Sequence, residues 1–89
     1  IQLEMGGRLL QNGSTATMLF DIAALIEYVS HRMPLEPGDV IATGTPAGVA
    51  AMHQPEAWLL PGATVSITLD GLGQLINPVR AGAPFLGQA

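Results

Sequence analysis

Residues 37–49 read PGDVIATGTPAGV, which is a turn, a short apolar run and a loop rich in glycine, threonine and proline. The Pro37-Gly38 pair favours a tight turn, because proline sets the first central φ angle and glycine tolerates a positive one. The run from Val40 to Thr43 predicts a short strand. A loop from Gly44 to about Pro55 follows it, so this junction is the sharpest candidate for chemistry in the chain.

The side chain that stands out at this junction is Thr45. Gly44 lets the backbone approach a ligand closely, and Pro46 restricts Thr45 to an extended conformation, which sets the direction of its hydroxyl. Thr45 can therefore offer a hydrogen bond to an oxyanion such as a carboxylate. On the pattern alone an ordinary loop is the favoured interpretation, since such clusters are common. The loop is not a P-loop, because no lysine follows the second glycine.

Upstream of this stretch, the pattern predicts a hairpin and then a helix. Ile1–Met5 and Arg8–Gln11 flank Gly6-Gly7, which is a two-residue turn signal. From Asp21, a capping residue, to His31, apolar residues recur at the spacing of one helix face. We expect this face to be buried; it consists of Ile22, Leu25, Ile26 and Val29.

Downstream, the pattern predicts a second hairpin. Pro61-Gly62 is a turn signal, Thr64–Leu69 reads as a strand, and Gln74–Val79 reads as its antiparallel partner across the turn at residues 71–73. Arg80–Ala89 reads as a tail. Short strands, frequent turns and one helix indicate an α+β domain dominated by sheet.

Composition predicts a chain that packs against something larger. The 89 residues make one domain at most, and 48% are hydrophobic while only 11% are charged, at a mean hydropathy of +0.39. Soluble domains usually carry about a quarter of charged residues. There is no initiator methionine, and Ile1 begins a predicted strand. We therefore expect a fragment that is covered by the rest of its polypeptide or by a partner subunit.

Charge and residue usage exclude several classes of partner. The formal net charge is -4, and three arginines are the only cations apart from the histidines. A chain without a basic patch cannot neutralise phosphates, so we expect no nucleic acid partner. No apolar run approaches the length of a membrane span, so we expect no membrane partner. The absence of cysteine excludes disulfides and thiolate metal sites.

The two histidines are weak candidates for catalysis. His31, near a helix end, is better explained as a partner of the C-terminal carbonyls than as a base. His53 lies in a polar loop three residues before Glu56, and two potential ligands do not make a metal site. A solvated loop is the favoured interpretation of His53.

Three ordered blocks resemble the fumarylacetoacetate hydrolase family. Leu35–Val49 carries a Pro-Gly-Asp turn that runs into a Thr-Gly-Thr-Pro-x-Gly-Val loop, the signature of that family. Gln11–Met18 is similar to its Gln-x-Gly-Asn-Thr-x-Asp-Met segment. Gly71–Leu75, with Asn77–Val79, is similar to its closing hairpin. The resemblance covers nearly the whole chain, to about Arg80, in the order and spacing of the family.

This resemblance implies a mixed β-roll, of which residues 1–80 are the C-terminal portion and residues 81–89 a tail. It implies a cytoplasmic homodimer that uses Mg²⁺ or Mn²⁺ to hydrolyse, decarboxylate or isomerise acylpyruvates or related 2-oxo acids. The metal of the family is held by a Glu-x-Glu pair and an Asp, with a Lys nearby, all upstream of this region. We therefore expect no metal ligand and no catalytic residue in this chain, which would be inactive alone.

The resemblance also ranks the residues of the loop. It makes Thr45 and Gly44 the substrate-binding candidates, because the matching Thr contacts the substrate, often its carboxylate. Three neighbours are expected to support the loop: Thr43, Pro46 and Gly48.

Two departures from the family pattern keep a rival hypothesis open. Thr17 stands where an Asp is usual, and Ala50–Leu60 is poor in the Gly and Lys often found there. The rival is a non-catalytic β-rich module for assembly or small-ligand binding, which includes a catalytically dead paralogue. The upstream coding sequence discriminates the two, because only the enzyme needs the Glu-x-Glu, the Asp and the Lys.

Overall fold

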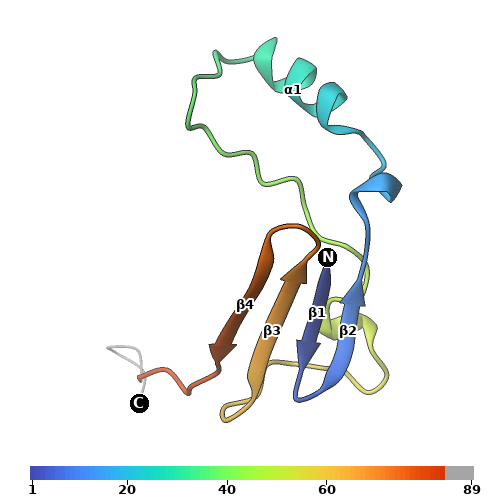
Figure 1. Ribbon diagram of the computed structural model, residues 1–89, viewed down its shortest axis with the longest axis vertical. Helices are drawn as coiled ribbons and strands as arrows, with labels where there is room; N and C mark the ends of the chain where they lie inside the picture. The colour runs from blue at the N-terminus through green and yellow to red at the C-terminus, as the bar shows by residue number, and fades with distance from the viewer. Residues whose placement is uncertain (84–89) are drawn as a thin grey trace.

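The computed structural model describes residues 1–83 and consists of one antiparallel sheet and one helix (Figure 1). The sheet has four strands in the order β2-β1-β3-β4, and a helix, α1, follows the first hairpin. The elements in chain order are β1 (Gln2–Met5), β2 (Arg8–Asn12), the 3-10 turn η1 (Thr15–Thr17), α1 (Ile22–Ser30), the 3-10 turn η2 (Ala50–Met52), β3 (Thr64–Leu69) and β4 (Gly73–Pro78). The α+β prediction is therefore confirmed.

The first hairpin forms as its turn residues require. Gly6 and Gly7 both have positive φ angles, of 58° and 80°, and Met5 pairs with Arg8 across them. Two consecutive positive φ angles are what a two-residue hairpin turn needs, and glycine adopts them without strain. After β2 the ladder continues for one bond, from the Gly13 amide to the Ile1 carbonyl at 2.9 Å, and the chain then leaves the sheet.

The second hairpin completes the sheet by pairing with the start of the chain. β3 spans the predicted residues, and β4 begins one residue earlier than predicted, opposite Leu69. β1 pairs with β3 in antiparallel register, with Leu3 opposite Ile67. The two hairpins, far apart in the sequence, thus lie side by side as one sheet (Figure 1).

The strand predicted from Val40 to Thr43 is wrong. These residues form no ladder in the described chain, and the Val40 side chain is 92% exposed. A strand needs a neighbour for its backbone N–H and C=O groups, and the segment passes beyond the end of the sheet without meeting one (Figure 1). The turn before it forms as predicted: the Asp39 amide donates to the Glu36 carbonyl at 3.1 Å, with Gly38 at a φ of 96°.

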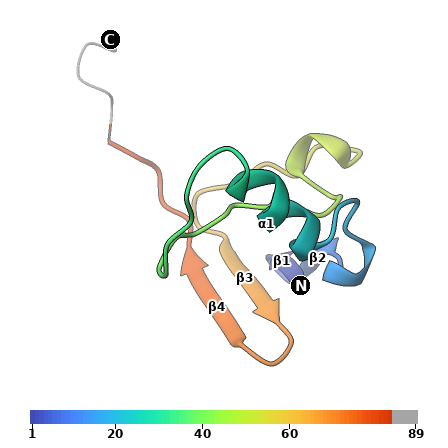
Figure 2. The same ribbon diagram turned by 90° about the horizontal axis from the view of Figure 1, so that it is seen from above.

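α1 is capped as predicted but is not buried. The Asp21 carboxylate accepts a hydrogen bond from the Ala24 amide at 2.8 Å, which satisfies a free N–H of the first turn. The helix lies beyond one end of the sheet (Figure 1), so that in the view from above it is seen in front of the strands (Figure 2). Ile22 and Ile26 are 56% and 45% exposed, so the predicted burial of the apolar face is wrong for the described residues. No helix in residues 1–83 has the length and apolar character needed to cross a bilayer.

The core is correspondingly small. Among the described residues only Leu10 and Ala57 are buried apolar side chains, each 8% exposed. The radius of gyration is 17.0 Å, whereas a compact domain of this length has about 12 Å. The chain therefore exposes much of the apolar surface that its composition supplies.

We predict that Leu10→Ala destabilises the chain far more than Leu9→Ala does. The two leucines are neighbours on β2, but Leu10 is 8% and Leu9 44% exposed. Deleting a buried leucine side chain costs about 2–5 kcal/mol, and the exposed neighbour should cost well under half of that. Urea denaturation followed by circular dichroism measures both. Equal shifts of the midpoint would contradict the burial assigned to the two faces of β2.

Candidate functional site

A groove lies where the two segments with the strongest motifs meet. It has a volume of about 770 Å³ and is lined by the last residue of β2 with the segment that follows it, and by the loop that begins at Thr43. The residues of these two segments that line it are Asn12, Gly13, Ser14, Thr15, Thr17, Met18, Leu19, Phe20, Thr43, Gly44, Thr45, Pro46 and Ala47. Two blocks that are about thirty residues apart in the sequence thus form one site.

Two glycines allow the loop to pack directly on β2 and on the segment after it. A Cβ atom at Gly13 would lie 2.7 Å from the Cβ of Pro46, closer than two carbon atoms can approach. A Cβ at Gly48 would overlap the Leu10 carbonyl oxygen, and Gly48 has a φ of 101°. Both positions therefore exclude a side chain, and Gly48 in addition needs a conformation that glycine alone adopts readily. The loop therefore packs against the sheet at Gly48, and its Pro46 packs directly on Gly13.

Gln11 ties the loop to the sheet through its side-chain amide. Nε2 of this half-buried residue donates to Thr45 Oγ1 at 2.9 Å and to the Pro46 carbonyl at 2.8 Å. Gln11 belongs to a block that resembles the family, but the sequence pattern predicted no role for it. No local signal could have found this role, because the partners lie 34 and 35 residues further along the chain.

His53 makes the second tie between loop and sheet. Its Nε2 lies 2.9 Å from the Gly48 carbonyl oxygen and 3.1 Å from the Leu10 carbonyl oxygen. Both partners only accept hydrogen bonds, so Nε2 carries the proton that is shared between them. The side chain is half-buried, and the prediction of a solvated histidine is therefore wrong. η2 lies against β2 through this contact (Figure 1).

Thr45 and Gly44 both line the groove and are exposed. Gly44 has a φ of 103°, and no atom of a neighbour lies within 4 Å of the place where its Cβ would be. Thr17, which stands at the usual Asp position, lines the same groove, but its hydroxyl donates to the Ser14 carbonyl at 2.9 Å. Its hydroxyl hydrogen is therefore used within its own turn.

Residues 1–80 match the family model described as the C-terminal region of fumarylacetoacetate hydrolase. The chain belongs to the fumarylacetoacetate hydrolase family. The match includes both segments that line the groove, and it ends close to the start of the tail.

Relatives of this fumarylacetoacetate hydrolase-family chain are longer than it is. It is 47% identical over 79 residues to a Burkholderia ambifaria protein with a provisional hydrolase name, and this match covers 88% of the chain and 28% of the relative. The structure of fumarylacetoacetate hydrolase from Exiguobacterium antarcticum matches at 43% identity with a TM-score of 0.83, over 91% of this chain and 29% of that one. The 5-carboxymethyl-2-hydroxymuconate delta-isomerase from Mycobacterium smegmatis matches at 43% identity with a TM-score of 0.72, over 89% and 29%. The family thus includes proteins described as hydrolases and as isomerases.

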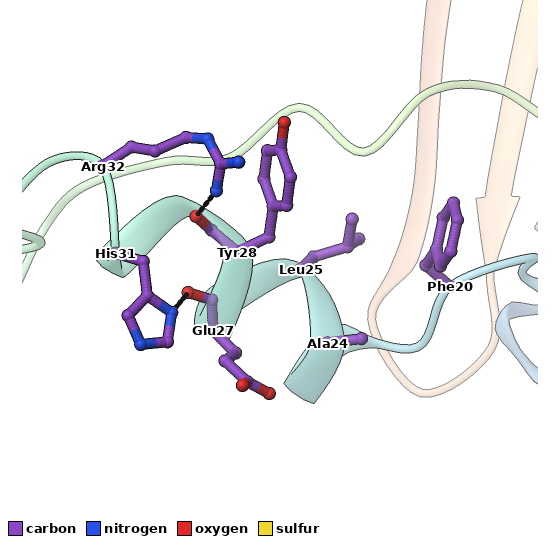
Figure 3. A pocket seen from close by; sticks show the side chains of 7 residues that line it. All are labelled: Phe20, Ala24, Leu25, Glu27, Tyr28, His31 and Arg32. Carbon is purple, nitrogen blue, oxygen red and sulfur yellow. Dashed lines mark hydrogen bonds between the residues drawn. The ribbon is translucent and has the colours of Figure 1, made fainter.

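A second hollow of about 620 Å³ runs along α1, from Phe20 before the helix to Arg32 after it (Figure 3). His31 Nδ1 lies 2.8 Å from the Glu27 carbonyl oxygen, and the Arg32 guanidinium donates to the Tyr28 carbonyl at 2.9 Å while it lies 3.5 Å from the centre of the Tyr28 ring. The interpretation of His31 as a partner of the helix carbonyls is therefore confirmed. This hollow contains none of the motif residues of the loop, so the candidate site is the groove.

The described residues of this family member contain no cluster of metal-binding side chains. Nowhere in residues 1–83 do three or more His, Asp or Glu side chains lie close enough together to share one ion. Glu56, the residue considered with His53, is exposed, and both carbonyl contacts of His53 already use its Nε2. The donors among residues 1–83 therefore do not fit a divalent cation.

We predict that His53→Ala lowers the stability of the chain while His31→Ala does not. His53 satisfies two carbonyls in a half-buried position, and leaving such groups without a partner costs about 1–3 kcal/mol. The His31 ring also contacts one carbonyl, but at an exposed helix end where water replaces it. Thermal denaturation measures the two changes, and amide exchange in residues 44–55 should accelerate only in His53→Ala. If His31→Ala lowers the midpoint as much, the tie between loop and sheet is not what stabilises the chain.

Proposed function

We propose that this chain forms the carboxylate-binding part of an enzyme that hydrolyses, decarboxylates or isomerises acylpyruvates or related 2-oxo acids. The observation that supports this best is the convergence of the two motif segments on one groove with the Thr45 hydroxyl at its surface. The chain spans less than a third of the relatives it matches, and the rest of the active site belongs to the remainder of the longer protein.

The role proposed for Thr45 is to orient the substrate. A 2-oxo acid carries a carboxylate beside its reactive carbonyl, so a donor that holds the carboxylate also sets the position of the carbon centre that reacts. Thr45 is exposed on the groove, and the Gln11 amide and the packing of Pro46 on Gly13 restrain its backbone and side chain. Gly44 has no side chain, which leaves room for the ligand next to the Thr45 hydroxyl.

In the proposed enzyme, the residues that hold the metal ion lie outside this chain. Mg²⁺ and Mn²⁺ prefer several oxygen ligands, and the described residues do not bring such a set together. We therefore propose that the carboxylates that hold the ion, and any catalytic lysine, lie in the remainder of the protein. The β-roll, the homodimer and the cytoplasmic location implied by the resemblance belong to the same proposal. The apolar surface left open on α1 and Val40 supports a further layer of structure over this end of the chain.

The competing function is a non-catalytic member of the family that binds a small ligand. Thr17 favours it, since a hydroxyl that is bonded to the Ser14 carbonyl cannot supply the charge of an Asp. The upstream coding sequence separates the two hypotheses. A Glu-x-Glu pair, a later Asp and a Lys support the enzyme, and their absence supports the binding module.

We predict that the purified 89-residue chain neither binds Mg²⁺ or Mn²⁺ tightly nor converts any acylpyruvate. Its acidic side chains do not cluster in the described residues, and a hard cation bound by one carboxylate keeps most of its water. Isothermal titration calorimetry with each metal tests the first part, and an absorbance assay for loss of the acylpyruvate tests the second. Saturable binding at micromolar concentration with one ion per chain would place a metal site here after all.

We predict that Thr45→Val in the full-length enzyme lowers kcat/KM by roughly ten- to a hundredfold. This follows because a hydrogen bond to a charged group contributes about 1.5–3 kcal/mol. Valine keeps the branched shape and removes the hydroxyl, so metal content should be unchanged, and the thermal midpoint should fall only by the small amount that the lost Gln11 hydrogen bond contributes. Thr43→Val is the matched control, because Thr43 is also a threonine that lines the groove. We expect the Thr43→Val enzyme to retain most of its activity. Full activity in Thr45→Val with a sharp fall in the thermal midpoint would make Thr45 a structural residue.

A further inference from the structure

The side chain of Gln11 has two hydrogen-bond donors, and both are used on the loop that carries Thr45. Its Nε2 lies 2.9 Å from Thr45 Oγ1 and 2.8 Å from the Pro46 carbonyl oxygen. The Pro46 carbonyl can only accept, which determines that the nitrogen of the carboxamide, and not its oxygen, faces the loop. The second N–H therefore points at the Thr45 hydroxyl, whose oxygen must act as the acceptor.

This polarity decides what the Thr45 hydroxyl can offer a ligand. A hydroxyl has one hydrogen and two lone pairs, and Gln11 occupies one lone pair while leaving the hydrogen free. A hydroxyl that already accepts a hydrogen bond is a stronger donor, because hydrogen bonds in a chain polarise one another. Thr45 thus presents a hydrogen to the groove and favours ligands that accept, such as a carboxylate, over ligands that donate.

We propose that Gln11 is a positioning residue that makes the Thr45 hydroxyl a donor toward the substrate carboxylate. This inference rests on the function proposed for Thr45 and adds the residue that determines its direction. Gln11 suits the task because it lies on the sheet: it is half-buried on β2, pairs with Leu3 on β1, and follows the buried Leu10. A side chain supported by a strand holds its partner more firmly than a neighbour within the loop would.

The test is a double-mutant cycle between Gln11→Met and Thr45→Val in the full-length enzyme with an acylpyruvate substrate. Methionine keeps the length of glutamine and removes both donors. We expect Gln11→Met alone to lower kcat/KM by roughly two- to tenfold, the range for one neutral hydrogen bond, through a higher KM with kcat almost unchanged. In the Thr45→Val background the same change should have less than about a twofold further effect, because the hydroxyl through which Gln11 acts is gone.

Gln11→Glu tests the polarity itself. The carboxylate has nearly the same shape but only accepts hydrogen bonds, so it would draw the Thr45 hydrogen away from the groove and repel the Pro46 carbonyl. We expect a larger rise in KM than Gln11→Met gives. The matched controls are Gln74→Met and Gln74→Glu, since Gln74 on β4 also donates to hydroxyls, Ser66 Oγ at 2.8 Å and Thr68 Oγ1 at 3.1 Å, but does not line the groove. Both should leave KM unchanged.

The outcomes separate this inference from the proposed function. Less than twofold loss from Gln11→Met in the Thr45→Val background, after a clear loss in the wild type, supports the inference. Equal losses in both backgrounds overturn it, because Gln11 would then act independently of the hydroxyl. A lower thermal midpoint with unchanged KM also overturns it, because Gln11 would be only structural. Full activity of Thr45→Val overturns the proposed function, and the inference falls with it.

Discussion

The structure depends on the contact between the loop at residues 44–55 and the end of β2. At this contact the Leu10 carbonyl meets Gly48, where no side chain fits, and shares the Nε2 proton of His53 with the Gly48 carbonyl. The Gln11 amide adds two more hydrogen bonds. Together with the packing of Pro46 on Gly13, these interactions hold the loop beside the segment after β2. The helix between the two segments lies beyond one end of the sheet (Figure 1).

The same contact explains how a chain with so small a core can position this groove. Buried apolar side chains usually supply most of the stability of a domain, yet only two are buried among the described residues. The loop is instead held by polar groups whose geometry is specific: a shared imidazole proton, a carboxamide with both N–H groups used, and a backbone that approaches too closely for a Cβ. Such contacts define a direction for the Thr45 hydroxyl, which apolar packing alone does not do.

Much apolar surface stays open in the described residues. Val40 is 92% and Leu19 90% exposed, and α1 presents Ile22 to solvent. Side chains of this kind are normally covered, and the low charge of the chain agrees with that. The failure of the predicted strand at Val40–Thr43 has the same physical origin. A β-prone run needs a hydrogen-bonding neighbour, and none lies beside it in residues 1–83.

Local chemistry was enough to determine both hairpins, the capped helix and the turn at Pro37-Gly38, because each depends on residues that are close together in the sequence. The order of the family-like blocks was likewise enough to identify the family and to single out Thr45. Only the tertiary structure decided which residues hold that threonine. Gln11 and His53 act on partners that the fold brings to them from 34 and 43 residues away. Periodicity and turn signals describe neighbours along the chain, whereas a hydrogen bond between distant segments exists only once the backbone has placed its donor and acceptor together.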